Sequence, residues 1–332
     1  MIDDLLAKRE WLLADGATGT NLFDMGLTSG DAPELWNETY PDRIQALHRR
    51  FVDAGADIIL SNSFGCNRRR LALHKLEGRT RDLNRLAAEN ARRVADEASR
   101  PIIVAGSVGP TGDLLAPLGA LTEAEAVEIF VEQIEGLKAG GANVVWIETM
   151  SAPEEMRAAA TAAARVGMPF TITASFDTAG CTMMGNAPAS LASFLTTLSP
   201  APCAIGSNCG VGASDLILST LSIAAEHPGA VVVAKANCGI PKVSGSKVEY
   251  TGTPELMADY ARLALDAGAR IIGGCCGTSP EHLAAMRRAL DTHIRRPRPE
   301  LSEIVARLGA LVSPPKSPDV AAGRHNRRRR TT

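Results

Sequence analysis

Aromatic side chains are scarce in this sequence, where Phe, Trp and Tyr together make up 4% of the 332 residues. Long apolar runs are also missing, and none reaches the roughly 18 residues that a membrane-spanning helix needs. The first ten residues are rich in charge and lack the apolar core of a secretory signal. These absences predict a cytoplasmic protein that does not associate with membranes.

A positive net charge is found only at the C-terminal end of the chain. Residues 295–332 hold ten Lys or Arg against three Asp or Glu, whereas the rest of the chain is acidic and the total is −2. We expect residues 1–294 to form one domain, followed by an extension (295–332) with a short helix within 301–312 and a disordered basic tail. The arginines at 327–330 could attract nucleic acid. A solvated tail is the simpler interpretation, so no nucleic-acid partner is expected.

Eight short apolar runs rich in β-branched residues recur along the chain, and their starts are 27 to 46 residues apart. Each gap has room for one helix and two loops, which predicts strands that alternate with helices in a parallel sheet. A doubly wound open sheet is the competing fold, but eight even units favour closure into a (β/α)8 TIM barrel. The runs are 11–14, 57–60, 102–105, 143–147, 170–174, 203–206, 230–234 and 270–272.

Helix boundaries are also marked in the sequence. Thr122 with Glu125, and Ser151 with Glu154, fit the capping box that opens a helix. Residues 80–98 place apolar side chains at three- and four-residue spacing, which predicts an amphipathic helix. Further expected boundaries are N-caps before proline at 253–254 and 279–280, and glycine C-caps within 54–56, 140–142 and 267–269.

Three cysteines follow predicted strands at the barrel rim where active sites of this fold lie. Cys209 lies just after the sixth run, and Cys275 with Cys276 follows the eighth. Three thiolates form a soft ligand set that zinc prefers, and three protein ligands leave one coordination position open for a substrate. Glycines on both sides of the Cys275–Cys276 pair allow the turn that both side chains need. The remaining cysteines are interpreted as packing residues: Cys66, Cys181, Cys203 and, less firmly, Cys238.

An open zinc position can activate either water or a substrate thiol. Hydrolytic zinc sites usually use His and carboxylate ligands, but none of the six histidines here directly follows a predicted strand. A shell made only of thiolates favours a thiol substrate, which zinc would hold as the nucleophilic thiolate near neutral pH. The expected chemistry is transfer of an alkyl group to sulfur.

At this point the motifs match a known family. The chain resembles the homocysteine S-methyltransferases over residues 10–293, through the blocks DGATGT (15–20), GSNC (206–209) and GGCC (273–276). Within that family it looks most like the bacterial betaine–homocysteine S-methyltransferases. The stretches that carry this likeness are LLADGATGTNLFDMGL, GDAPELWN, AGSVGPTGDL, SAPEE, SFDTAGCTMMG and IIGGCCGTSPEHL.

The resemblance implies roles for individual residues. Cys209, Cys275 and Cys276 would bind Zn2+, with the sulfur of homocysteine as the fourth ligand. Asp15 and Glu148 would hold the homocysteine ammonium. Backbone N–H groups near Gly16 and Ala17, helped by Ser63, would receive its carboxylate, and Asn208 of the second block also counts among the substrate-binding residues.

The methyl donor is less well defined by the resemblance. Trp36 matches a donor-contacting tryptophan of the animal betaine enzymes, although core packing explains it equally well. Two tyrosines that those enzymes place near the donor are replaced by Gly65 and Thr149. Because a quaternary ammonium binds an aromatic cage, other aromatics would have to substitute, and the candidates are Phe64, Trp146 and Phe176.

Betaine is the favoured donor on this evidence, with methionine and dimethylglycine as products. The alternative is a sulfonium donor such as S-methylmethionine or a dimethylsulfonio compound. A methylcobalamin donor would need a partner protein, since no cobalamin-binding domain is expected in this sequence. A non-catalytic zinc-binding barrel is a more remote alternative, and the family resemblance is compatible with a homo-oligomer.

Overall fold

A computed structural model describes residues 2–244 and 247–314. Eight parallel strands form the central sheet in the order β1-β10-β7-β6-β5-β4-β3-β2. A parallel bridge between Ala14 and Ile58 joins β1 to β2 and closes the ring. The strands are β1 (Leu12–Leu13), β2 (Ile58–Leu60), β3 (Ile103–Val108), β4 (Val144–Met150), β5 (Phe170–Ala174), β6 (Ala204–Cys209), β7 (Val232–Ala236) and β10 (Ala269–Gly274). The predicted (β/α)8 TIM barrel is confirmed.

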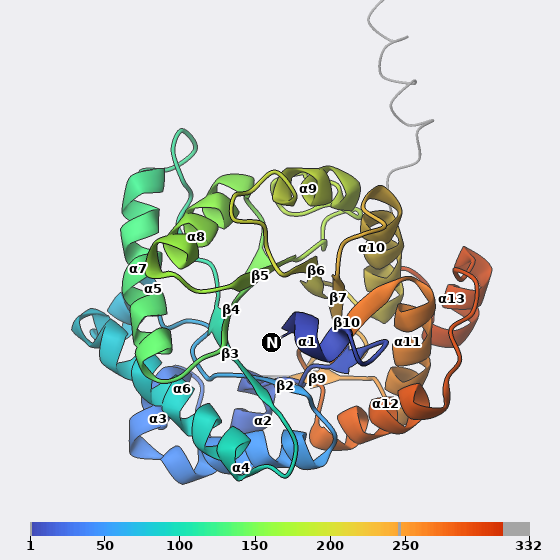
Figure 1. The fold of residues 1–332 in the computed structure, drawn as a ribbon, viewed down its shortest axis with the longest axis horizontal. Coiled ribbons are helices and arrows are strands. Elements are labelled where there is room, and N and C mark those ends of the chain that lie inside the picture. The colour runs from blue at the N-terminus through green and yellow to red at the C-terminus, as the bar shows by residue number, and fades with distance from the viewer. Residues whose placement is uncertain (1, 245–246, 315–332) are drawn as a thin grey trace, which may run out of the picture.

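Helices surround this ring of strands (Figure 1). The main ones are α4 (Pro41–Asp53), α6 (Thr80–Glu97), α7 (Glu123–Ala139), α8 (Pro153–Val166), α9 (Pro188–Leu195), α10 (Ala213–Glu226), α11 (Pro254–Asp266) and α12 (Pro280–Thr292). Shorter ones are α1 (Ile2–Leu6), α2 (Gly19–Asp24), α3 (Trp36–Thr39), α5 (Arg68–Leu71), α13 (Leu301–Leu308) and the 3-10 turns η1 (Pro33–Leu35), η2 (Ala72–His74) and η3 (Glu77–Arg79). A two-stranded hairpin, β8 (Pro241–Ser244) and β9 (Lys247–Tyr250), follows β7.

The expected helix boundaries are largely confirmed. Thr122 and Glu125 form the reciprocal capping box, and Thr253 accepts the N–H of Leu256 at the start of α11. The box expected at Ser151 is wrong, because α8 begins one residue later, with Ala152 as an N-cap that makes no side-chain hydrogen bond. Proline is most stable at the first helical position, and Pro153 therefore fixes the start of α8.

Helix α1 closes one end of the barrel. It lies across the centre of the strand ring in Figure 1, where the N-terminus is marked. Its buried Ile2 and Leu6 belong to the same apolar cluster as the inward-facing Leu12, Ile58 and Ile103. This end is the N-terminal side of the strands, so α1 leaves the opposite rim, where the cysteines lie, to the functional loops.

The C-terminal extension packs against the barrel as far as it is described. The expected helix within 301–312 is confirmed as α13, which ends earlier, at Gly309, where φ is +98°. Beyond it, the N–H groups of Val312 and Ser313 donate to the carboxylate of Asp215 on α10. The basic tail, including 327–330, lies outside the described residues.

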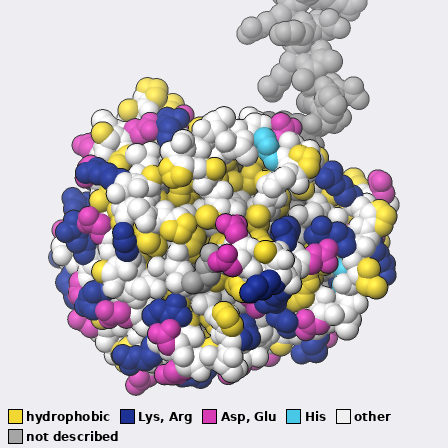
Figure 2. Space-filling model, viewed as in Figure 1, with side chains coloured by type: hydrophobic (Ala, Val, Ile, Leu, Met, Phe, Trp, Pro, Cys, Tyr) yellow, Lys and Arg dark blue, Asp and Glu magenta, His cyan; other side chains and the backbone are white. Residues whose placement is uncertain are grey.

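Charged side chains are mixed on the outer surface. On the face shown in Figure 2, Lys and Arg alternate with Asp and Glu around the helices and do not form a patch of one sign. Among the described residues, no helix is long and apolar enough to cross a membrane.

Asp57 pairs with more than one arginine at the closed end of the barrel. Its buried carboxylate lies 2.7 Å from Arg9 and 3.1 Å from Arg100, and it also accepts the N–H of Leu13. Because Asp57→Ala leaves these donors without their acceptor, we expect the free energy of unfolding to fall by about 2–3 kcal/mol. Urea denaturation measures this change.

Asp96→Ala provides the matched control. Asp96 is exposed and pairs with Arg92 one helical turn earlier. Exposed pairs of this kind contribute only about 0.5 kcal/mol. Equal losses in the two variants would contradict the structural role of Asp57.

Candidate metal centre

The three predicted cysteines come together at the C-terminal rim of the barrel. The sulfur atoms of Cys209, Cys275 and Cys276 all lie within 4.8 Å of one another. In a tetrahedral site with metal–sulfur bonds of 2.3 Å, sulfurs lie about 3.8 Å apart. The cluster would therefore need to contract by at most about 1 Å to hold a metal ion. Within the described part of the chain, no second group of His, Cys, Asp or Glu meets the same geometric condition.

The backbone turns sharply at Cys209 and directly after the Cys275–Cys276 pair. Cys209 has a φ of +63°, a left-handed conformation that is rare for residues other than glycine. Gly277, directly after the pair, has a φ of +79°. Strained conformations of this kind persist where the surrounding structure holds them, and they cluster at functional sites. The turns at both ends allow three thiols from two strands to face one point.

Asn237 holds the two cysteine-bearing loops together. Its side-chain oxygen accepts the N–H of Cys276 at 3.1 Å, and its nitrogen donates to the carbonyl of Gly210 at 2.7 Å. The N–H of Cys275 donates to the carbonyl of Ala236, the last residue of β7. Sequence reasoning placed Asn237 at the end of a strand but gave it no role.

The thiols perturb one another's ionisation. A hydrogen bond from Cys275 lowers the pKa of Cys209, but its hydrogen bond with Cys276 and its burial raise that pKa overall, to about 12. The hydrogen bond with Cys209 lowers the pKa of Cys276, but the hydrogen bond with Cys275, the charge of Cys275 and burial together raise that pKa to about 12. Three adjacent thiolates repel each other, so their joint deprotonation requires a cation between them. The donor set therefore fits a soft, thiolate-binding metal ion.

The other cysteines lie outside the cluster. Cys238 is buried behind it and donates its N–H to the carbonyl of Cys276. Cys66 packs in a small apolar cluster of its own, and Cys203 packs near the closed end of the barrel. Cys181 lies in the loop after β5, where its N–H and carbonyl pair with Thr178.

Two buried carboxylates lie inside the same rim. Asp15 follows β1 and accepts the N–H of Leu60 at 2.7 Å, and Glu148 in β4 accepts the hydroxyl of Ser107. Burial raises the pKa of both carboxyl groups. The N–H of Gly274, the residue before Cys275, donates to the carbonyl of Asp15, and the N–H of Thr149, the residue after Glu148, donates to the side chain of Asn208, the residue before Cys209.

Lys235 is the charged residue that sequence reasoning missed. Its ammonium lies 2.8 Å from a carboxylate oxygen of Asp15 and 5.9 Å from the ring centroid of Trp146. The signal was present, because a lysine interrupts the apolar run of β7, and parallel strands of a barrel are buried on both faces.

Several expected substrate-binding groups already have partners inside the protein. The N–H of Ala17 donates to the carbonyl of Thr278, and the hydroxyl of Ser63 donates to the carbonyl of Ser107. Gly16 is packed so closely that a Cβ would lie 2.6 Å from that same Thr278 carbonyl oxygen. The N–H of Ala17 and the hydroxyl of Ser63 are therefore already hydrogen-bonded within the protein.

Asn208 is also buried and ties neighbouring strands together. Its side-chain oxygen accepts the N–H of Thr149 at 2.8 Å and the hydroxyl of Thr173 at 2.7 Å. Thr149 has a φ of +60°, so this bond fixes a second strained residue at the rim. The side-chain nitrogen of Asn208 lies 3.9 Å from the sulfur of Cys275.

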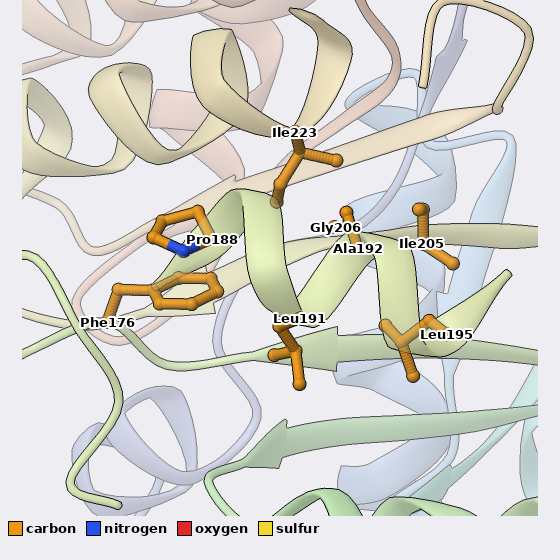
Figure 3. A pocket seen from close by; sticks show the side chains of 8 residues that line it. All are labelled: Phe176, Pro188, Leu191, Ala192, Leu195, Ile205, Gly206 and Ile223. Atoms are coloured by element: carbon orange, nitrogen blue, oxygen red, sulfur yellow. The ribbon is translucent and has the colours of Figure 1, made fainter. Parts of the chain in front are cut away.

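The aromatic residues suggested for a donor pocket are mostly packed elsewhere. Trp36 is 5% exposed in the outer core, with the guanidinium of Arg43 5.1 Å from its ring centroid. Trp146 is fully buried among the inward-facing residues of the barrel. Phe176 lies beside Pro188 in an apolar crevice that is too tight to hold water (Figure 3). Phe64, at 39% exposed, is the one of these four with a large accessible surface.

Tyr250 is an aromatic residue at the cluster that sequence reasoning did not consider. It ends β9 and packs against Gly277, the residue after Cys276, and burial together with the charge of Cys276 raises the pKa of its hydroxyl. A Cβ added to Gly277 would lie 2.3 Å from Cγ of Tyr250, so the glycine allows this close packing. Its distance along the chain from the thiols hid this contact from sequence analysis.

Comparison with known proteins defines the family. A family model described as homocysteine S-methyltransferase matches residues 12–290. The chain belongs to the homocysteine S-methyltransferase family. It is 32% identical to the methionine synthase of Mycobacterium leprae over 314 residues, which cover 88% of this chain, and 32% identical to that of Mycobacterium tuberculosis over 316 residues, which cover 90%.

The chain spans only 26% of the length of these two methionine synthases. Among solved structures, it is similar to the homocysteine methyltransferase MmuM from Escherichia coli in its metallated form. That similarity has a TM-score of 0.69 and 26% identity, and it covers 86% of this chain and 98% of that one. The resemblance inferred from the motifs is confirmed at the level of the family.

Proposed function

We propose that the protein is a zinc-dependent enzyme that transfers a methyl group from betaine to homocysteine, giving methionine and dimethylglycine. The observation that carries this proposal is the cluster of three thiols beside two buried carboxylates on one barrel rim. The seven free cysteines fit a reducing, cytoplasmic location.

Cys209, Cys275 and Cys276 would hold the zinc ion, since soft sulfur donors suit it. Zinc bound there would supply the positive charge that keeps the homocysteine sulfur in its thiolate form near neutral pH. Asp15 and Glu148 would accept hydrogen bonds from the homocysteine ammonium. Binding both ends of one substrate would fix the direction from which its sulfur meets the donor methyl.

The charge of the site favours a cationic methyl donor. Three thiolates and one divalent ion carry a net charge of −1, and a homocysteine thiolate makes it −2. In the transfer, the sulfur lone pair forms the new S–CH3 bond as the C–N bond of betaine breaks, and that bonding pair remains on nitrogen. Opposite charges cancel as the bond forms, so a site that excludes water favours the reaction. Tyr250, beside the thiols, and the exposed Phe64 would be the aromatic side chains that contact the donor.

A panel of methyl donors tests the proposal. We expect methionine to form from homocysteine with betaine, and chelation of zinc to abolish the reaction until zinc is restored. A sulfonium such as S-methylmethionine shares the positive charge and is the alternative donor. Faster turnover with the sulfonium would reassign the donor, and absence of methionine with every donor would overturn the enzyme proposal.

A further inference from the structure

Lys235 is a cation buried at the floor of the proposed homocysteine pocket. Its side chain is 2% exposed, and its ammonium donates to both the carbonyl and a carboxylate oxygen of Asp15, at 3.1 and 2.8 Å. The other carboxylate oxygen of Asp15 accepts the N–H of Leu60. The carboxylate is thereby held from two sides in one orientation.

Structural stability alone does not account for a buried ion pair at this position. Moving two charges out of water is costly, and apolar residues of similar volume often replace such a pair without loss of stability. The neighbouring inward-facing side chains are apolar, Val233 and Trp146 among them. A hydrophobic residue at position 235 would continue that packing. The pair is therefore better explained by what it does for the pocket above it.

The charge balance of the pocket indicates what Lys235 does there. Asp15 and Glu148 are both buried, and burial raises the pKa of both carboxyl groups, whereas the charge of Lys235 opposes the rise in each. Two buried carboxylates without a cation repel each other, and one of them tends to take up a proton. A protonated carboxyl group is a poorer acceptor for an ammonium. With Lys235 the three groups sum to −1, which one substrate ammonium neutralises.

We propose that Lys235 is a positioning residue for the amino-acid substrate, which orients Asp15 and matches the pocket's net charge to a single ammonium group. This inference rests on the proposed function. It gives Lys235 no contact with the reacting sulfur or methyl group. Its loss should therefore weaken homocysteine binding more than it slows the bound complex.

The test compares Lys235→Met with the unchanged protein in its zinc-loaded form. We expect KM for homocysteine, and Kd measured by calorimetry, to rise at least about ten-fold, while kcat at saturating homocysteine falls less than about three-fold. Zinc content should be unchanged. Lys235→Arg keeps the charge and should recover much of the affinity. If Lys235→Met does not fold, Lys235→Gln replaces it in the test. The KM of Lys235→Arg should then lie between the KM of the unchanged protein and that of Lys235→Gln.

A double-mutant cycle and a matched control separate this role from general destabilisation. Adding Asp15→Asn to Lys235→Met removes the unpaired carboxylate, so the two losses in affinity should be clearly non-additive. Asp266→Asn disturbs another buried pair, with His293 at 2.8 Å, and should lower stability without changing KM. Unchanged affinity in Lys235→Met would overturn this inference alone, whereas failure of the unchanged protein to bind homocysteine would overturn the proposed function.

Discussion

Cys209→Ser is expected to abolish zinc binding and to lower methionine formation by at least about 1,000-fold. Serine is a hard and weakly acidic oxygen donor, so it cannot replace a thiolate in a soft ligand set. Two remaining thiols would leave the metal held by half of a tetrahedral shell. Cys209 also has a φ of +63°, and hydrogen bonds hold the residues on either side of it, Asn208 to Thr149 and Gly210 to Asn237. Metal analysis and turnover, measured on the same sample, check both parts.

Cys238→Ser is the more stringent of two control variants for Cys209→Ser. Cys238 is buried directly behind Cys276 but does not belong to the cluster of three sulfurs. We expect this variant to keep its zinc and most of its turnover. Cys203→Ser, at the other end of the barrel, should behave in the same way. Loss of zinc from Cys238→Ser would show that the metal is held by a ligand set other than the proposed one.

The fold could be predicted from the sequence because its signals are local and repeated. Each strand contains an apolar run, and several helices start or end at capping residues whose chemistry acts over a few positions. The error at Ser151 has the same local origin. Two signals overlapped there, and the preference of Pro153 for the first helical position outweighed the capping box.

The site could be predicted only in part, because its contacts depend on tertiary packing. Active sites of this fold lie at the C-terminal ends of the strands, which predicted that the three cysteines meet there, and the structure confirms that they do. The partners of Ala17, Ser63 and Asn208 lie far away along the chain, so the sequence could not show that their polar groups were already hydrogen-bonded. Trp36 likewise lies under Arg43, a contact that no motif encodes.

Glu148→Gln is expected to lower kcat/KM for homocysteine by about 100-fold, mostly through KM, with zinc content unchanged. Glutamine keeps the size of the side chain and can still accept the hydroxyl of Ser107. It removes the negative charge, and a buried charge pair that loses one partner costs about 2–5 kcal/mol in binding. The net charge of the pocket also becomes zero, because the positive charge of Lys235 then balances Asp15 alone. Steady-state kinetics with varied homocysteine measure this change.

Glu155→Gln is the matched control, since it neutralises a second buried carboxylate whose pKa is also raised by burial. Glu155 lies in the first turn of α8 and accepts both the N–H and the hydroxyl of Thr111. We expect it to alter stability but to leave KM for homocysteine within about two-fold of its original value.

Similar KM values in Glu148→Gln and the unchanged protein would place the ammonium elsewhere. A rise in KM for thiols that lack an amino group would show that Glu148 acts on the sulfur end of the site, whereas a rise confined to homocysteine assigns it to the ammonium.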